Sequence, residues 1–206
     1  MEEQERKKHW EDIYHTKSLN EVSWYQPIPQ TSLELIAACQ LPKDAKIIDV
    51  GGGDGFLVDH LLDNGYLDLT VLDISKAAID RAKQRLGDRA DQVQWIVADA
   101  SSFTPDQSYD LWHDRAAFHF LTQKNDIDHY LKSLSKGLSS GAYLILGTFS
   151  ENGPKKCSGI EIKQYSALSM QELLKDQFEV IKTMNVDHPT PFDTVQNFTF
   201  GSFKKL

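Results

Sequence analysis

The hydrophobic positions of the chain form short apolar runs that alternate with stretches of helical periodicity. Five apolar runs predict buried strands, within residues 47–50, 68–72, 93–97, 109–113 and 142–149. The stretches between them carry apolar side chains every three or four residues, which predicts amphipathic helices. Strands that alternate with helices are typical of a parallel sheet covered on both faces. We therefore predict an α/β fold with a doubly wound, mostly parallel sheet.

The last third of the chain departs from this alternation. Residues 178–184 and 195–203 predict two further strands with no helix between them, and strands connected in this way can pair antiparallel. Before them, Ser169 and Glu172 have the spacing of a capping box, so a helix is expected to begin at Ser169. The sheet is thus predicted to end in an antiparallel hairpin.

The first part of the chain precedes the predicted sheet. Apolar positions in residues 10–17 share one face of an amphipathic helix. Residues 23–29 contain two prolines and are expected to be extended or turning. A second capping-box pattern at residues 31–34 opens a helix that should end before Pro42. We predict that residues 1–42 form a helical lid.

Length and composition fit one domain. The chain has 206 residues, of which 40% are hydrophobic and 25% are charged, as in an ordinary globular protein. A chain of this length can bury a full core without disulfides or a structural metal. No repeat or flexible linker divides the sequence. We therefore predict a single domain over residues 1–206, with the lid at 1–42 and an α/β core at 43–206.

Charge and cysteine content exclude several function classes. The 22 Lys and Arg residues against 30 Asp and Glu give a net charge of −8, which argues against a nucleic-acid partner and favours a cationic or neutral ligand. The longest apolar run is too short to cross a membrane. Two cysteines without ligand spacing predict no metal site. The charged first ten residues lack an apolar signal region, so a cytoplasmic protein is expected.

The most informative motif is the glycine-rich sequence Asp-Val-Gly-Gly-Gly-Asp-Gly at residues 49–55. It lies where the first strand must turn into the first helix, and glycines there let a ligand approach the backbone closely. Asp73 ends the second predicted strand, at the distance along the chain where a carboxylate accepts hydrogen bonds from ribose hydroxyls. Asp99 and Ala100 follow the third strand, where an adenine would lie. These positions together predict an adenosine-containing ligand.

The spacing of the glycines distinguishes between adenosine ligands. Dinucleotide-binding loops follow the pattern Gly-x-Gly-x-x-Gly, but counting from Gly51 places Phe56 at the last glycine position. The glycines instead stand at 51, 53 and 55. No Gly-Lys-Ser or Gly-Lys-Thr follows the loop, so a nucleoside-triphosphate loop is absent from the sequence. A dinucleotide oxidoreductase is therefore the weaker alternative.

The pattern acid-x-Gly-x-Gly-x-Gly, formed by Asp49, Gly51, Gly53 and Gly55, resembles the first motif of the class I S-adenosylmethionine-dependent methyltransferases. The resemblance extends over residues 45–150 and implies a Rossmann-like core with a seven-stranded sheet and an antiparallel terminal hairpin. It also implies S-adenosylmethionine as the cofactor.

Carried over position by position, the resemblance implies a role for each matched residue. Gly51 and Gly53 would approach the methionine part, and Asp49 would help to hold its ammonium group. Asp73 would bind the ribose. The adenine would contact three residues, Ile74, Asp99 and Ala100.

Two narrower resemblances concern the acceptor. His-Trp-Glu-Asp-Ile-Tyr at residues 9–14 and Ser-Trp-Tyr at 23–25 look like the opening of seven-strand lysine methyltransferases, which modify translation elongation factors or citrate synthase. Trp-His-Asp-Arg-Ala at residues 112–116 is similar to the Trp-Asp-Arg-Gly of thiopurine methyltransferases, in which the arginine lies beside cofactor and substrate. The resemblances thus imply either a protein lysine or a small molecule as acceptor.

Methyl transfer from a sulfonium needs mainly alignment and exclusion of water, because the leaving group already carries its positive charge. A general base is required only where the acceptor must lose a proton. Asp114 is the candidate base, together with Arg115 as its catalytic neighbour, because the end of the fourth strand faces the same sheet edge as the glycine loop. In the alternative, Asp114 pairs with Arg115 and shapes the loop. Trp24 is predicted either to cover the cofactor as part of a lid or to pack in the core.

Three functions are consistent with these residues. The leading hypothesis is methyl transfer from S-adenosylmethionine to a small molecule or a protein lysine. A dinucleotide-dependent oxidoreductase is the second hypothesis. The third is a regulatory module that binds S-adenosylmethionine without catalysis.

Overall fold

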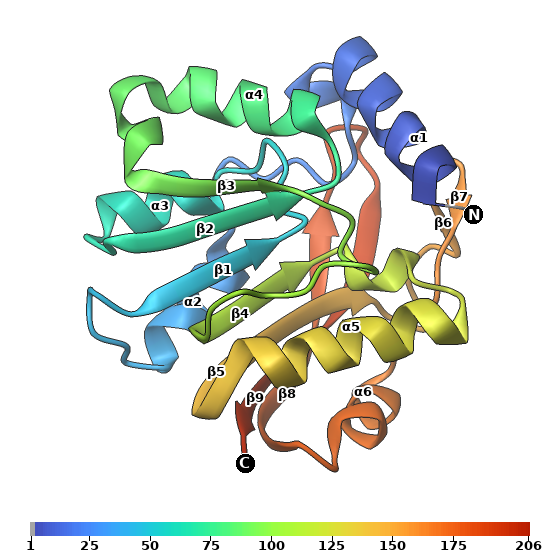
Figure 1. The fold of residues 1–206 in the computed structure, drawn as a ribbon. Helices are drawn as coiled ribbons and strands as arrows, with labels where there is room; N and C mark the ends of the chain where they lie inside the picture. Colours follow the sequence, from blue (N-terminus) through green and yellow to red (C-terminus); the bar gives the residue numbers. More distant parts are fainter. Residues whose placement is uncertain (1–2) are drawn as a thin grey trace.

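The computed structural model describes residues 3–206 and contains a seven-stranded sheet in the order β3-β2-β1-β4-β5-β9-β8 (Figure 1). The first five strands run parallel to one another, while β9 is antiparallel to both of its neighbours. This arrangement confirms the predicted doubly wound sheet with its antiparallel terminal hairpin. The strands of the sheet are β1 (Lys46–Val50), β2 (Asp68–Asp73), β3 (Val93–Val97), β4 (Tyr109–Arg115), β5 (Leu138–Phe149), β8 (Phe178–Pro189) and β9 (Val195–Lys205).

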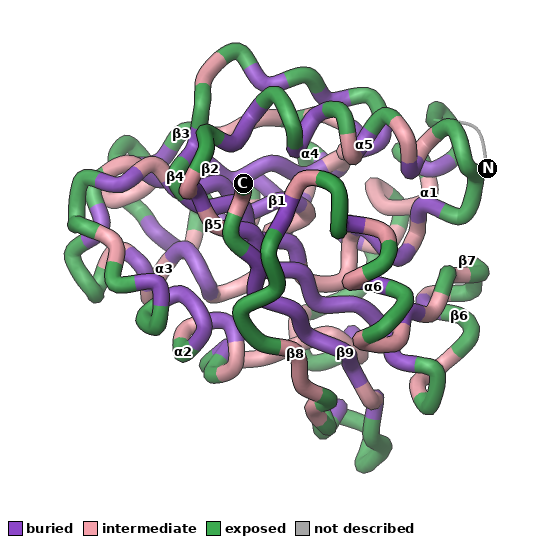
Figure 2. Tube along the Cα trace, turned by 90° about the horizontal axis from the view of Figure 1, so that it is seen from below, coloured by how far each residue is buried: buried purple, intermediate pink, exposed green. Residues whose placement is uncertain are grey.

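Alternating side chains of the strands enter two hydrophobic cores, one on each face of the sheet. On β1, Ile47 joins one core and Ile48 the other, as the two-residue period of a strand requires. Figure 2 accordingly shows buried positions along the central strands. One core contains residues of α2 (Gln30–Ala38) and α3 (Leu57–Asp63), and the other contains residues of α5 (Lys124–Gly137) and α6 (Ala167–Leu174).

The remaining two α-helices within residues 3–206 are α4 and α1. Helix α4 (Lys76–Leu86) follows β2, and Ser75 caps it by accepting a hydrogen bond from the amide of Ala78 at 3.2 Å. Helix α1 (Glu3–Thr16) packs against α4. A two-stranded sheet made of β6 (Lys156–Cys157) and β7 (Ile160–Glu161) lies beside α1 in Figure 1.

Two predicted helix starts are wrong. Helix α6 begins at Ala167 rather than Ser169, because Ser166 is the N-cap and its hydroxyl accepts a hydrogen bond from the Ser169 amide at 3.2 Å. Glu172, which was expected to close the capping box, instead lies 2.5 Å from Lys175 in an exposed ion pair. A capping box does form in α6, between Ser166 and Ser169, three residues before the predicted position.

The second shift concerns α2. This helix begins at Gln30, with Pro29 as its N-cap, and it ends at Ala38, before Pro42 as predicted. Glu34 accepts a hydrogen bond from the Gln30 side chain at 2.8 Å, so it stabilises the first turn from within the helix instead of closing a capping box with Thr31. Within residues 3–206, no helix is both long and apolar enough to cross a membrane.

Candidate active site

A cavity opens at the carboxyl ends of β1, β2 and β4, under a roof formed by α1 and residues 17–29. Two parts of its lining differ in chemistry. We call the part at the ends of β1, β2 and β3 the glycine half; it contains Gly51, Asp73, Ile74, Asp99 and Ala100. We call the part beyond β4 the aromatic half; it contains Trp24, Arg115, Phe120, Phe149 and Phe198.

The glycine loop turns tightly around the end of β2. The amides of Gly51 and Gly52 both donate hydrogen bonds to the carbonyl oxygen of Leu72, at 2.7 and 3.2 Å. Gly51 has a φ of +71°, and a Cβ at this position would collide with the side chain of Ala117. A side chain is therefore excluded at Gly51 by both the backbone conformation and the lack of space.

Gly53 has a similar conformation but a different neighbour. Its φ is +54°, and an added Cβ would lie 2.6 Å from the hydroxyl oxygen of Tyr14 on α1. Gly53 is covered by this tyrosine and is absent from the cavity lining, whereas Gly51, Gly52 and Gly55 belong to it. The loop thus has one side toward the cavity and the other under the roof.

Asp73 stands at the end of β2 and lines the cavity. Its side chain is buried, and one carboxylate oxygen accepts a hydrogen bond from the Ser75 amide at 2.8 Å. Burial, with the nearby charges of Asp54 and Asp49, raises the pKa of Asp73 to about 7, although the Ser75 and Gly53 amides oppose this shift. The position is the one expected of a ribose-binding carboxylate, and that role stays a prediction.

Asp49 is held by a buried hydrogen-bond chain that sequence reasoning missed. Its Oδ1 atom lies 2.7 Å from Nδ1 of His113, and Nε2 of the same histidine lies 2.8 Å from the hydroxyl of Ser32. Asp49 and His113 are paired neighbours on β1 and β4, so the sheet register brings them together. A histidine directly beside a strand-end acid fixes the orientation of the carboxylate.

Asp99 is bound by an arginine that was not predicted as a site residue. Nε of Arg6, on α1, donates to one carboxylate oxygen of Asp99 at 2.7 Å, and the amide of Ser101 donates to the other at 2.8 Å. Arg6 also donates to the hydroxyl of Ser101 and lies 3.2 Å from Asp126. The roof is therefore attached to the wall of the cavity where Asp99, Ala100 and Ile74 lie.

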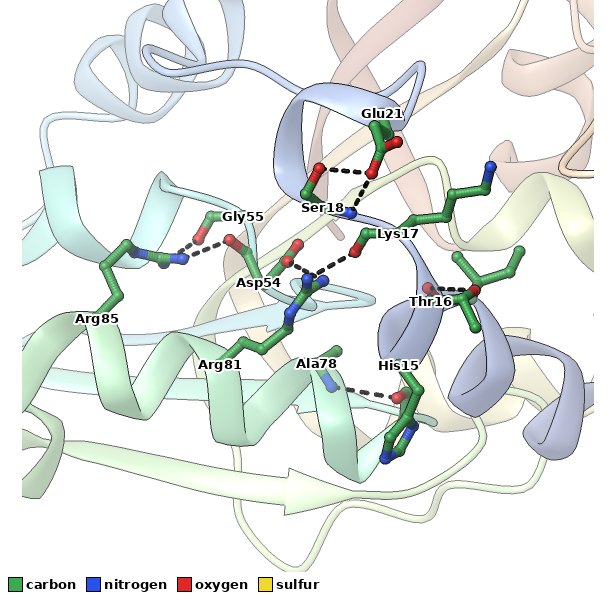
Figure 3. A network of polar contacts seen from close by, with 12 residues as sticks. His15, Thr16, Lys17, Ser18, Glu21, Asp54, Gly55, Ala78, Arg81 and Arg85 are labelled. Carbon is green, nitrogen blue, oxygen red and sulfur yellow. Dashed lines mark hydrogen bonds and ion pairs between the residues drawn. The ribbon is translucent and has the colours of Figure 1, made fainter.

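The roof is attached at a second place, above the glycine loop. Arg81 of α4 donates to the carbonyl oxygen of Lys17 at 2.6 Å and to Asp54 at 3.1 Å (Figure 3). Arg85, one turn further along α4, donates to the carbonyl oxygens of Asp54 and Gly55 at 2.6 and 2.7 Å. The two arginines thereby connect α4, the glycine loop and the end of α1.

Glu11 provides a third attachment. Its carboxylate accepts hydrogen bonds from the amides of Lys76 and Ala77, at 2.7 and 3.1 Å, and from the hydroxyl of Ser75 at 3.1 Å. These amides are at the N-terminus of α4, where a negative charge interacts favourably with the helix dipole. A residue of α1 thus completes the cap of α4.

The structure does not bring Asp114 into the cavity lining. Its carboxylate is fully buried and accepts hydrogen bonds from the amides of Ala117 and Phe118, at 3.0 and 3.1 Å, and from the hydroxyl of Tyr130 at 2.7 Å. Burial raises the pKa of Asp114 to about 6. The carboxylate shapes the loop through backbone amides, and neither of its oxygens bonds to Arg115, which corrects the pairing that the sequence suggested.

Arg115 does line the cavity, unlike Asp114. Its Nη1 atom donates to the carbonyl oxygen of Trp24 at 3.2 Å, and its guanidinium carbon lies 4.8 Å from the centre of the Phe198 ring. Nη2 is buried without a hydrogen-bond partner. Burial lowers the pKa of Arg115 to about 10, so the side chain remains positively charged at neutral pH.

Trp24 contributes both to the roof and to the lining. Its ring packs edge-on against Trp10 at 5.7 Å and against Tyr14 at 6.2 Å, between ring centres. Trp10 in turn contacts Phe120 at 5.0 Å. The sequence left two roles open for Trp24, in a lid or in packing. In the structure its ring lines the cavity and also packs against the other rings of the roof.

Comparison with known proteins gives a family match for the part of the chain that forms this site. The model of the methyltransferase domain family matches residues 48–144, which include the glycine loop, Asp73, Asp99 and Arg115. Within this range the chain matches a methyltransferase domain, similar to the class I S-adenosylmethionine-dependent methyltransferases. S-adenosylmethionine is the methyl donor of this family.

Curated relatives resemble parts of this chain. Malonyl-[acyl-carrier protein] O-methyltransferase 1 of Ilyobacter polytropus is 33% identical over 110 residues, which are 52% of this chain and 39% of that protein. The eEF1A lysine and N-terminal methyltransferase of Mus musculus is 26% identical over 162 residues, which are 73% of this chain and 22% of that protein. The chain thus spans well under half the length of either relative.

A solved structure extends the likeness to the whole fold. The N-methyltransferase NodS from Bradyrhizobium japonicum, in complex with S-adenosylhomocysteine, superimposes with a TM-score of 0.73. The match covers 97% of this chain and 98% of that protein, at 15% sequence identity. At this identity the likeness supports the fold alone.

The cavity fits the cofactor of the family on its own geometry. The backbone of Gly51, Gly52 and Gly55 lines the cavity, and the buried carboxylate of Asp73 lines the same region. Seven of the eight residues predicted to bind the cofactor line the cavity, and Gly53 is the exception. Among residues 3–206, no group of three His, Cys, Asp or Glu side chains is placed to hold a metal ion.

Proposed function

We propose that this methyltransferase transfers a methyl group from S-adenosylmethionine to a small molecule. The observation that carries the proposal is the meeting of two different surfaces in one cavity: the glycine half, with its strand-end acids, and the aromatic half beyond β4. A nucleoside with a charged methionine part suits the first surface, and an acceptor with an aromatic ring suits the second.

The residues of the glycine half would hold the cofactor in an extended pose. Asp73 would accept hydrogen bonds from the ribose hydroxyls, and Ile74, Asp99 and Ala100 would contact the adenine. Asp49, oriented by His113, would hold the ammonium group near the bare backbone of Gly51. When bound, S-adenosylmethionine supplies a methyl group on a positively charged sulfur.

Catalysis would then depend on alignment more than on proton transfer. The rings of Trp10, Trp24 and Phe120 pack on one another and cover the cavity, so they would exclude water from the reacting atoms. Holding acceptor and methyl group in line can supply about 7–11 kcal/mol in favourable cases. We do not assign Asp114 as a base, because its oxygens are occupied by two amides and the Tyr130 hydroxyl.

The charge of the aromatic half favours a small molecule over a protein lysine. Arg115 keeps a positive charge there, and a lysine ammonium brought to the same place would be repelled. The roof over the cavity, attached through Arg6, Glu11 and Arg81, also restricts access for a protein side chain. Lysine methylation is therefore the second candidate, supported by the resemblance of residues 9–14 and 23–25.

Two experiments test the proposed function. In calorimetry, we expect S-adenosylhomocysteine to bind and NADH to give no heat of binding; the reverse result would support a dinucleotide oxidoreductase. In the second, the protein is incubated with methyl-labelled S-adenosylmethionine and cell extract, which is then divided into small-molecule and macromolecular fractions. Label in the small-molecule fraction supports the proposal, and label in a protein band supports lysine methylation. Binding of the cofactor without transfer to either fraction would favour a regulatory module.

A further inference from the structure

Arg115 differs from every other arginine of the chain. The sequence contains five arginines, at positions 6, 81, 85, 89 and 115. The first four each form an ion pair with an aspartate, at N–O distances between 2.6 and 3.2 Å. Arg115 forms no such pair with any residue in the range 3–206, although it is more enclosed than Arg81 or Arg89.

The surroundings of Arg115 leave part of its hydrogen-bonding capacity unused. One face of the guanidinium stacks on Phe198, and Nη1 bonds to the carbonyl oxygen of Trp24. Nη2 has no partner and is shielded by the protein. Asp49 is an acid whose negative charge acts on Arg115. Its carboxylate already bonds to His113, and it is not within ion-pair distance of the arginine.

An enclosed guanidinium without a carboxylate is costly unless an anion completes it. Removing a charge from water carries a penalty of several kcal/mol, which a paired anion and its hydrogen bonds can offset. The planar fork of N–H groups on arginine matches a carboxylate in particular. The unsatisfied Nη2 atom, at a cavity wall, is therefore the place where a bound molecule would present an anionic group.

A second polar atom in the same half is also unsatisfied. Gln196 lies on β9, two residues before Phe198, and its side chain therefore points to the same face of the strand. It lines the cavity, and its Oε1 atom is buried without a hydrogen-bond partner. At this wall of the cavity, Arg115 thus offers an unsatisfied donor and Gln196 an unsatisfied acceptor, among apolar rings.

The methionine part of the cofactor also has a carboxylate, which is a second candidate for the anion that Arg115 binds. The glycine turn follows β1, whereas the side chain of Arg115 extends from β4 to a ring on β9, with β5 between those two strands. Arg115 therefore points away from the glycine half. This direction favours an anion on the acceptor rather than the carboxylate of the methionine part.

We infer that Arg115 binds an anionic group of the methyl acceptor and that the acceptor is an aromatic carboxylate. The inference rests on the proposed function and names its substrate class. Phe149 and Phe198, whose ring centres are 4.8 Å apart, and Trp24 would contact the ring of the acceptor. Gln196 would hydrogen-bond to a second polar group. The net charge of −8 suggested a cationic or neutral ligand, but the charged side chain in the aromatic half is that of Arg115.

The test uses pairs of probes that differ only in charge. Benzoate, phenylacetate, indole-3-acetate and 1-naphthoate are each compared with the corresponding amide, by calorimetry in the presence of saturating S-adenosylhomocysteine. The protein variants are the wild type, Arg115→Met, Arg115→Lys and, as a matched control, Arg89→Met, which loses only an exposed ion pair with Asp63.

We expect at least one carboxylate to bind the wild type about tenfold more tightly than its amide. Arg115→Met should lose this preference, Arg115→Lys should keep part of it, and Arg89→Met should keep all of it. Binding of S-adenosylhomocysteine within about twofold of wild type would show that Arg115→Met is folded and that the cofactor does not depend on Arg115.

Two results would overturn the inference, and both leave the proposed function standing. The first is the absence of any carboxylate preference across the four pairs. The second is a variant Arg115→Met that binds S-adenosylhomocysteine tenfold more weakly but binds 5′-methylthioadenosine, which lacks the amino acid part, normally; Arg115 would then hold the cofactor's carboxylate. A wild-type protein that binds no S-adenosylhomocysteine would instead contradict the proposed function itself.

Discussion

The two halves of the cavity are built in opposite ways. The glycine half is formed by backbone and acids: a turn with positive φ at Gly51, and carboxylates at the ends of neighbouring parallel strands, Asp73 among them. The aromatic half is formed by rings and one cation, Arg115, which has no carboxylate partner within residues 3–206. The first surface suits a polar molecule of fixed shape. The second surface is made of side chains, so substitutions there can change which acceptor it binds.

The largest expected effect comes from disturbing the backbone turn of the glycine half. Gly51→Ala places a Cβ against the side chain of Ala117 at a φ of +71°, so the turn must move. Strain of about 1–3 kcal/mol together with this collision should weaken binding of S-adenosylhomocysteine by at least about 100-fold in calorimetry. Gly65→Ala is the matched control, because its φ is +82° and an added Cβ meets nothing within 4 Å. Equal affinity of Gly51→Ala and wild type would show that the ligand does not use this turn.

The next effect concerns the acid at the end of β2. Asp73→Asn keeps the shape of the side chain but removes its charge, and hydrogen bonds to charged groups contribute about 1.5–3 kcal/mol. We expect affinity for S-adenosylhomocysteine to fall by about 10- to 100-fold, with binding of the aromatic probes unchanged. Asp63→Asn, at an exposed position, is the control. A loss of probe binding equal to the loss of cofactor binding would mean that the two halves do not act separately.

A pH profile sharpens the same assignment. Burial raises the pKa of Asp73 to about 7, and ribose hydroxyls would donate to the ionised form. Cofactor binding therefore favours loss of the proton, so affinity should fall as the pH decreases below about 7 and should level off above it. The limiting slope is about tenfold per pH unit. Asp73→Asn should remove this dependence, and a profile of the same slope in that variant would assign the titration to another group.

The smallest expected effect lies in the aromatic half. Phe198→Leu removes the ring on which Arg115 stacks, and such contacts contribute about 0.5–2 kcal/mol. Affinity for the preferred aromatic carboxylate should fall by about fivefold, while affinity for S-adenosylhomocysteine should not change. Phe192→Leu, at an exposed position of the terminal hairpin, is the control. A larger loss for the cofactor than for the probe would contradict the division of the cavity into two halves.

Much of the fold could be predicted from short-range pattern. The strand at residues 93–97 occurs where a run of apolar residues predicted it. The helix that Ser75 caps occurs where the capping residue and the helical spacing of apolar residues predicted it. The start of α6 was missed because Ser166 and Ser169 both fit an N-cap, and the choice depends on how the helix packs. Met170 and Leu174 are buried against the sheet, whereas Leu168 is 78% exposed.

The candidate site shows the same division between local and distant information. Asp73 and Asp99 were found because each follows a strand, and strand ends of a parallel sheet meet at one edge. Arg6 was missed because its partner Asp99 is 93 residues away, and nothing near Arg6 in the sequence indicates that contact. Asp114 was placed at the correct edge, but the direction of its side chain depends on Tyr130 and on the amides of the following loop.

The sequence by itself determined where the backbone turns and which carboxylates end the strands, because these features depend on residues that are neighbours along the chain. Only the tertiary structure decided which charges are neutralised. Arg6 forms an ion pair with Asp99. Arg115 stacks on a ring and donates to a carbonyl oxygen, but it pairs with no acid within the described residues. Such pairings depend on segments brought together by the packing of the whole sheet, and an ion pair contributes only when both partners reach the same place.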